Sequence, residues 1–194
     1  MQIGAIPVPI YPTISESDYQ YILNHAEITY VFAEGEELLR KIEHILPEVP
    51  SLKGIYTFID RGRHNYLSQL LEAGKANLDL AKIEAIKATI KEDDLACIIY
   101  TSGTTGVSKG VMLDHSNMDE AMERHLERLE GQVHEDQISM NFLPLSHVFE
   151  CAWCNFCLTK GIRIAVNENA KEISDTLKEV KPDLMCSVPR FWEK

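Results

Sequence analysis

The chain has 194 residues, of which 45% are hydrophobic and 25% charged, and its formal net charge is -11. Such values are ordinary for a soluble globular protein, and this length allows one domain or two small ones with a sizeable core. The acidic balance argues against a nucleic-acid-binding protein, because affinity for the phosphate backbone depends largely on Lys and Arg.

The first half of the chain alternates short β-rich runs with apolar stripes of helical period. Prolines punctuate residues 4–11, which predicts an extended segment or an edge strand. Ser15, with Asp18 three residues later, predicts the start of a helix. The pattern then predicts a strand at 28–33, a helix at 38–45 that Pro47 stops, a strand at 54–59 and weaker helices within 66–90.

The second half continues the alternation. The continuous apolar run 95–100 predicts a strand that is covered on both faces. Ser116 is the expected N-cap of a helix with one apolar face, formed by Met118, Met122, Leu126 and Leu129. Strands are then expected at 138–143, 162–166 and 184–188, and helices at 149–157 and 173–180. This order predicts an α/β fold with a mostly parallel sheet and helices on both faces.

Apolar runs and cysteines indicate where the protein resides. No run approaches the roughly twenty residues of a membrane helix, and the N-terminus lacks the pattern of a signal peptide. Five cysteines without a framework of spacings predict reduced thiols, so we expect a cytoplasmic protein. Cys151, Cys154 and Cys157 superficially match an iron–sulfur run, but their apolar setting and the missing fourth ligand predict core packing and no metal.

Residues 100–111 are the most informative segment for chemistry. They follow the strand at 95–100, and they are rich in Gly, Ser and Thr before Lys109. Glycines let backbone N–H groups turn towards an anion, hydroxyls donate to phosphate oxygens, and Lys109 supplies a cation. The glycine spacing differs from a Walker A loop. A solvated surface turn is the alternative, but the ordered run at the end of a strand favours phosphate binding.

This segment resembles the phosphate-loop signature of the adenylate-forming (AMP-binding) enzymes, a superfamily that includes acyl-CoA synthetases, peptide-synthetase adenylation domains and luciferases. Ser108 stands where the family usually has Pro, which removes no phosphate ligand. Residues 4–13, 21–27, 143–150 and 181–194 are similar to the long-chain fatty-acid:CoA ligase branch. The resemblance implies that residues 1–194 are part of the N-terminal AMP-binding domain, with the C-terminal domain absent.

The resemblance implies a two-step reaction. A long-chain fatty acid attacks the α-phosphate of ATP to give an acyl-adenylate and pyrophosphate, and CoA then takes the acyl group. The residues expected to bind the nucleotide phosphates are Tyr100, Thr101, Ser102, Gly103, Thr104, Thr105, Gly106 and Lys109. Magnesium is expected near Tyr100 or Thr104.

A second motif at 143–150 carries His147 and Glu150. The resemblance places His147 near the acyl carboxylate and the adenylate, whereas a lone His after a strand is more often structural. Glu150 is expected to be a solvated or capping carboxylate, with a role in the same site as the alternative.

The family's later motifs do not follow Lys194, namely its magnesium-binding glutamate, ribose-binding aspartate, hinge and catalytic lysine. We therefore expect these residues to be inactive alone, and an adenylating enzyme for another acid or a non-catalytic nucleotide-binding module remains an alternative. The parent enzyme is expected in the cytoplasm, with peripheral attachment to the inner membrane face left open. Apolar stretches near both ends of the chain predict a homo-oligomer.

Overall fold

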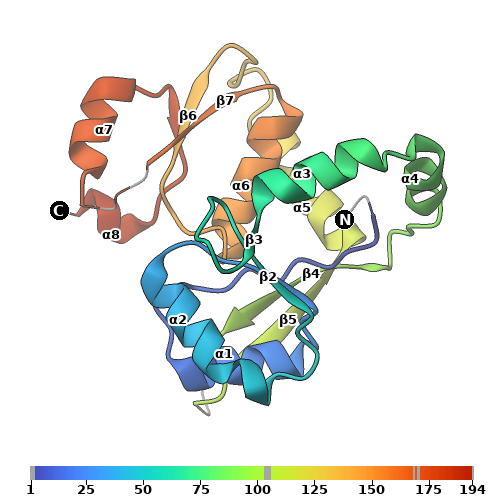
Figure 1. The fold of residues 1–194 in the computed structure, drawn as a ribbon. Helices are drawn as coiled ribbons and strands as arrows, with labels where there is room; N and C mark the ends of the chain where they lie inside the picture. Colours follow the sequence, from blue (N-terminus) through green and yellow to red (C-terminus); the bar gives the residue numbers. More distant parts are fainter. Residues whose placement is uncertain (1–2, 103–105, 168, 170, 194) are drawn as a thin grey trace. The chain divides into compact units, whose positions relative to one another are not determined.

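A computed structural model describes residues 3–102, 106–167, 169 and 171–193 (Figure 1). The chain divides into two compact units. Unit 1 comprises residues 1–90 and 100–111, and unit 2 comprises residues 91–99 and 112–194.

The described residues of unit 1 form a small parallel sheet and four α-helices. The strands β1 (Tyr30–Phe32), β2 (Gly54–Thr57) and β3 (Asn65–Tyr66) lie in the order β1-β2-β3, and Val31 is opposite Ile55. The helices are α1 (Glu16–His25), α2 (Glu36–Ile45), α3 (Leu67–Ala76) and α4 (Leu80–Lys87). A 3-10 turn, Leu46–Glu48, follows α2 and contains Pro47.

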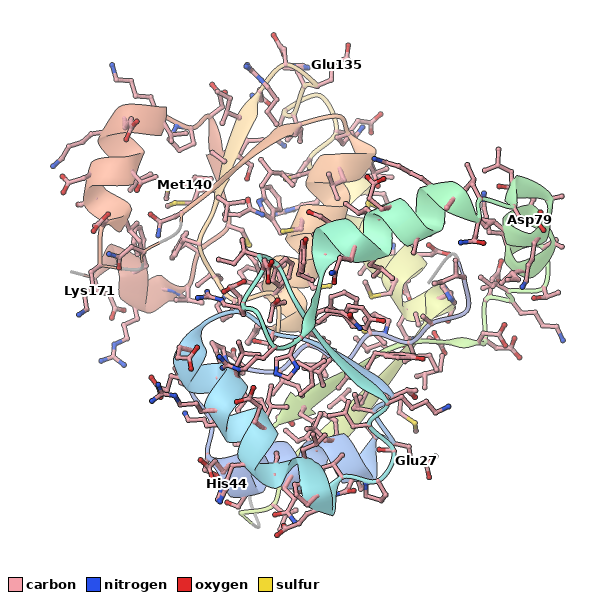
Figure 2. All side chains as sticks on the ribbon, in the orientation of Figure 1. Glu27, His44, Asp79, Glu135, Met140 and Lys171 are labelled. Atoms are coloured by element: carbon pink, nitrogen blue, oxygen red, sulfur yellow. The ribbon has the colours of Figure 1, made fainter. Side chains whose placement is uncertain are left out.

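The core of unit 1 lies where α1 and α2 pack together. One cluster contains Tyr19 and Leu23 of α1 with Ile45 and Val49, and a neighbouring cluster joins α2 to β1 and β2. The Ser15 hydroxyl accepts a hydrogen bond from the backbone N–H of Asp18, as the capping pattern predicts. His44 of α2, labelled in Figure 2, contacts Glu16 of α1 at 2.7 Å on the exposed side.

The strands β4 (Leu95–Thr101) and β5 (Lys109–Asp114) form a two-stranded sheet, and both cross the boundary between the units. Unit 2 continues with α5 (His115–Arg128), β6 (Ile138–Asn141), α6 (Val148–Thr159) and β7 (Arg163–Val166). It ends with α7 (Ile173–Val180), β8 (Leu184–Met185) and the short α8 (Pro189–Trp192).

The second parallel sheet has β6 in the middle, in the order β7-β6-β8. The chain passes from β6 to β7 through α6 and then returns across β6 to β8 through α7. Because such crossovers are right-handed, two that run in opposite directions place their helices on opposite faces. Figure 1 shows α6 and α7 on either side of this sheet. Met140 of β6, labelled in Figure 2, is therefore completely buried.

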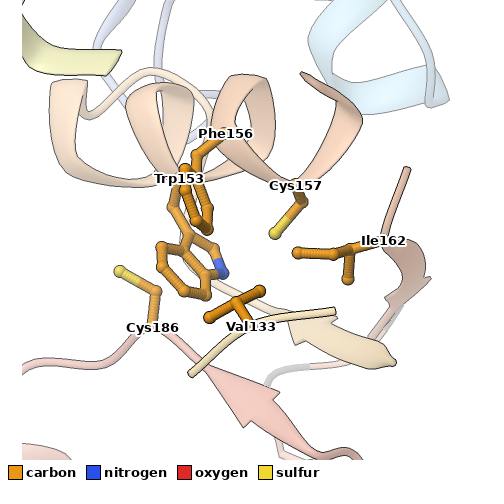
Figure 3. Close-up of a cluster of buried hydrophobic side chains, with 6 residues drawn as sticks. All are labelled: Val133, Trp153, Phe156, Cys157, Ile162 and Cys186. Carbon is orange, nitrogen blue, oxygen red and sulfur yellow. The ribbon is translucent and has the colours of Figure 1, made fainter. Parts of the chain in front are cut away.

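The core of unit 2 forms between α6 and the sheet (Figure 3). Its buried members are Val133, Trp153, Phe156, Cys157, Ile162 and Cys186. Met122, Leu126 and Leu129 of α5 pack against this cluster, which confirms the predicted apolar face, whereas Met118 lies outside it. Gly161 follows the C-cap of α6, with a φ of 70° that a residue with a Cβ rarely adopts.

The predicted α/β class, with parallel strands and helices, is confirmed, but the strands form three small sheets. Residues 4–11 form no strand, so the edge strand, one of the two alternatives for this segment, is excluded. Three details differ from the expectations. The strand β5 was not expected. The N-cap of α5 is Asp114, with Ser116 inside the helix, and β8 ends at Met185, whereas a strand was expected as far as residue 188.

Candidate nucleotide and acyl site

The expected phosphate segment begins at the end of β4. Tyr100 is 8% exposed, while Thr101 and Ser102 are exposed, so the strand passes from the core to the surface where the segment starts. Gly103, Thr104 and Thr105 lie outside the described residues. The expected role of these three residues is therefore not examined by the structure.

The second half of the segment leads into β5. Gly106 has a φ of 85°, a left-handed conformation that favours glycine at this position. Lys109 is the first residue of β5, and its side chain is exposed. Among the described residues the Lys109 ammonium has no ion pair, so it is available to an anionic ligand.

The Tyr100 hydroxyl is bound by a residue that sequence reasoning did not select. It lies 2.7 Å from Nδ1 of His25, the last residue of α1, and the two rings meet edge to face. Tyr21, one turn earlier on α1, stacks on the His25 ring at 5.2 Å. Burial, and then the nearby Tyr21, raise the pKa of Tyr100, so its hydroxyl stays protonated. The hydroxyl donates to Nδ1 when His25 carries its proton on Nε2, and it accepts when the proton is on Nδ1.

This hydrogen bond bears on the expected magnesium site. A protonated phenol is a weak ligand for magnesium, which prefers carboxylates and phosphate oxygens. Residues 100–111 contain no Asp or Glu. Thr104 lies outside the described residues, so this segment by itself does not fit as a complete magnesium site, and we assign no step to the metal.

His147 is exposed and caps α6. Its Nδ1 accepts a hydrogen bond from the backbone N–H of Phe149 at 3.2 Å, so the neutral ring carries its proton on Nε2. Within the described part of the chain, Nε2 has no hydrogen-bond partner. The His147 side chain thus combines the capping role with a donor that can meet an anionic ligand at the N-terminus of a helix.

Glu150 is buried, contrary to its expected place as a solvated or capping carboxylate. Only 1% of the residue is exposed, and neither carboxyl oxygen has a hydrogen-bond partner among the described residues. The neighbouring residue Phe149 is 41% exposed. At the start of α6 the residue that turns inwards is therefore the acid and not the aromatic ring before it.

A polar network lies beneath α6. The Trp153 indole donates to the Ser139 hydroxyl at 2.9 Å, and Ser139 donates to the Asn141 side chain at 3.0 Å. The Asn141 amide in turn donates to Sγ of Cys154 at 2.7 Å. These contacts satisfy polar groups on the face of β6 that α6 covers.

Of the three cysteines expected in the core, Cys157 is a buried member of the cluster beneath α6, while Cys151 and Cys154 are partly exposed. Cys97, Cys157 and Cys186 are buried, and all five cysteines are free thiols. Burial raises the pKa of the Cys154 thiol to about 11 and that of Cys186 to about 12. The described residues contain no group of three or more His, Cys, Asp or Glu side chains that could hold a metal ion.

The expected phosphate segment belongs to unit 1, while His147 and Glu150 belong to unit 2. The structure brings together Tyr100 and His25 in the first unit, and His147 and Glu150 on one helical turn in the second. That the two groups share one ligand stays a prediction.

The fold is an α/β arrangement with parallel strands, a class in which ligands commonly bind at the carboxyl ends of the strands. Residues 1–194 match the AMP-binding enzyme family, and the chain belongs to that family. This finding confirms the resemblance drawn from residues 100–111.

The curated relatives include long-chain fatty-acid–CoA ligases. The enzyme from Mycobacterium bovis is 31% identical over 194 residues, which are 100% of this chain and 32% of the relative. A human ligase is 32% identical over 207 aligned residues, covering 98% of this chain and 30% of its own length. The chain therefore spans about a third of the length of these relatives.

Solved structures share the fold. A long-chain-fatty-acid–CoA ligase from Archaeoglobus fulgidus matches with a TM-score of 0.77 and 24% identity, over 97% of this chain and 36% of that one. ATP-bound MatB from Rhodopseudomonas palustris matches with a TM-score of 0.67 and 21% identity, over 97% of this chain and 35% of that one.

In the described residues, no helix is both long and apolar enough to cross a membrane.

Proposed function

We propose that this chain is part of the N-terminal domain of a long-chain fatty-acid:CoA ligase, an acid–thiol ligase. The observation that carries the proposal is the buried strand β4, which ends in a Gly/Ser/Thr-rich segment closed by Lys109, in a chain that the AMP-binding family matches throughout. The long-chain ligases among the relatives support the substrate class.

In the proposed reaction, a fatty-acid carboxylate attacks the α-phosphate of ATP and pyrophosphate leaves. The CoA thiol then attacks the acyl carbonyl, and AMP leaves with the electrons of the broken bond. Catalysis of such a transfer consists mainly of positioning and charge neutralisation. Magnesium would neutralise phosphate charge when bound.

The chain's own residues hold and orient the ligands. Backbone N–H groups and hydroxyls of residues 101–106, with the Lys109 ammonium, bind the phosphates, and Tyr100 anchors the segment to α1. The His147 Nε2–H group donates to the acyl carboxylate or to the adenylate. Free thiols at all five cysteines support a reducing compartment such as the cytoplasm, where the enzyme either is dissolved or attaches to the membrane surface.

Nucleotide binding tests the phosphate segment. ATP should raise the melting temperature of the chain, because a ligand at a hundredfold excess over its Kd stabilises a protein by about 2.7 kcal/mol. Lys109→Ala should reduce this shift, since it removes a cation that faces phosphate. Lys53→Ala, an exposed lysine of unit 1, is the matched control and should leave the shift unchanged. Equal shifts in wild type and Lys109→Ala would exclude Lys109 as a phosphate ligand.

The substrate class is tested in the enzyme of which this chain is part. Acyl-CoA formation should be faster with palmitate than with acetate or an aromatic acid at equal concentration. A preference for a short or aromatic acid would favour the alternative of an adenylating enzyme for another substrate.

A further inference from the structure

Glu150 occupies a position at which a carboxylate usually has a partner. His147 is the N-cap of α6, and Glu150 is therefore the third residue of the helix. A Glu at this position commonly accepts a hydrogen bond from the N-cap backbone N–H. Here that N–H of His147 donates to the Pro144 carbonyl at 2.9 Å, so this partner is already taken.

The carboxyl group is buried beneath the segment that carries His147. The backbone N–H of Phe142 faces it and favours its charged form, although the pair does not reach hydrogen-bonding geometry. Ser146 is 6% exposed, and its hydroxyl likewise has no hydrogen-bond partner among the described residues. Two buried polar side chains without partners thus flank the cap of α6, and such groups call for an explanation.

Glu150 is a buried ionisable group in this region. Burial raises its pKa to about 7, and the Phe142 N–H opposes this only in part. The other ionisable groups that face it are the thiols of Cys154 and Cys157 on α6 and of Cys186 after β8. Burial raises the pKa of each thiol, so all three stay neutral under the same conditions.

We propose that Glu150 is a positioning residue for His147. The buried carboxylate of Glu150, three residues after the N-cap, attracts the Phe142 N–H that faces it and so holds the segment 142–147 from within. When the carboxyl group is protonated it loses this attraction, and the turn at Pro144 that carries His147 relaxes. The importance of this effect for catalysis rests on the proposed function, since it assumes that His147 contacts the acyl group or the adenylate.

NMR titration of the whole 194-residue chain between pH 5.5 and 8.5 tests the coupling without any assay of activity. The Phe142 and Ser146 amides should shift with a midpoint near 7, the pKa to which burial raises Glu150. Glu150→Gln, which is nearly isosteric and does not ionise, should abolish this step. Glu123→Gln, at an exposed glutamate of α5, is the matched control and should retain it.

A third variant separates the effect of Glu150 from any effect of the His147 ring. His147→Asn keeps an N-cap acceptor but removes the imidazole, and the Phe142 step should persist in it. The inference is overturned if the step survives in Glu150→Gln, disappears in His147→Asn, or is absent from the wild type. If Glu150→Gln does not fold, the titrations of the wild type and of His147→Asn still test the inference.

Ligand binding distinguishes this inference from the proposed function. If the step is present but neither ATP nor a non-hydrolysable acyl-adenylate analogue binds the parent enzyme, the proposed function fails and the coupling stands. If the analogue binds but its affinity in Glu150→Gln has the same pH profile as in the wild type, the positioning role fails.

Discussion

The contact between Tyr100 and His25 shows how one side chain connects the expected ligand segment to a rigid helix. Tyr100 is the last buried residue of β4, and its hydroxyl reaches a ring that Tyr21 also covers. α1 is itself fixed by Tyr19, which is 3% exposed and whose hydroxyl donates to the Tyr11 carbonyl. The start of the phosphate segment is thereby fixed before any ligand binds, which lowers the cost of ordering it on binding.

A double-mutant cycle tests this contact. Tyr100→Phe and His25→Leu should each destabilise the chain by about 1 kcal/mol, because each leaves one hydrogen-bonding group without its partner. The double variant should lose less than the sum, with a coupling of at least about 0.5 kcal/mol in urea unfolding. His25→Asn, which offers an acceptor in place of Nδ1, is expected to recover part of the loss. Additive effects would show that the two groups do not interact in solution.

Glu150 gives the chain a pH dependence of opposite sign to that of its surface acids. Its folded pKa of about 7 lies above the ordinary 4.5, so the folded state binds the proton more tightly than the unfolded state. Its contribution to stability is therefore full below about pH 4.5 and is lost as the pH rises through 7. By linkage the loss is roughly 3 kcal/mol.

Urea unfolding at pH 5 and pH 8 measures this contribution. Glu150→Gln should gain stability relative to wild type as the pH rises, because glutamine does not ionise. Three surface acids have lowered pKa values, namely Glu34, Glu43 and Asp175, caused first by side-chain hydrogen bonds from Arg61, Arg63 and Lys178 respectively. Their contributions to the pH dependence of stability are the same in both proteins. A constant difference between the two proteins at both pH values would contradict the burial of an ionisable carboxyl group.

At the scale of helices and strands, the sequence predicts those helix ends that depend on contacts between neighbouring residues. Ser15 and Gly161 mark helix ends because capping and left-handed conformations depend on single residues. The start of α5 shows the limit, since both Asp114 and Ser116 are suitable caps. Asp114 takes the role because it also accepts the hydroxyl of Ser116, at 2.7 Å, and exchanges hydrogen bonds with Asn117 in a capping box.

The strand β5 and the burial of Glu150 differ from the sequence-based expectations, and both differences have causes in the tertiary structure. β5 is a strand with Val111 and Met112 exposed, so its apolar residues do not show the alternation of a half-buried strand. Glu150 lies inside the core because its capping partner is taken by Pro144, a bond that no periodicity reveals. Likewise, the partner of Tyr100 lies 75 residues away, and only the fold brings His25 to it.

The cap of α1 provides a test at this scale. Ser15→Ala should destabilise the chain by about 1 kcal/mol in urea unfolding, because it leaves the Asp18 N–H without its acceptor. Ser68→Ala, an exposed serine within α3, is the control and should change stability little. Equal effects of the two substitutions would mean that the cap adds nothing measurable to the stability of unit 1.

At the scale of the whole molecule, exposed aromatic side chains support the expected self-association. Tyr30 and Phe32 of β1 are 53% and 50% exposed, and both rings lie against Tyr56 of β2. Alternation along a strand places these two residues on one face, opposite Val31, which packs against the core. Phe58 and Ile59, which follow β2, are 50% and 56% exposed. Contiguous apolar surface of this kind commonly marks an interaction site.

We therefore expect the isolated chain to associate through the aromatic face of β1. Light scattering should give a molar mass above that of one chain, rising with concentration. The double variant Tyr30→Thr, Phe32→Thr keeps residues that suit a strand but removes both rings, and it should weaken association at least about tenfold, or about 1.4 kcal/mol. Leu71→Gln removes a 54% exposed apolar side chain from α3 and should leave the mass unchanged. A wild-type chain that stays monomeric at high concentration would exclude association, and an equal effect of Leu71→Gln would show that general hydrophobicity, not the β1 face, drives it.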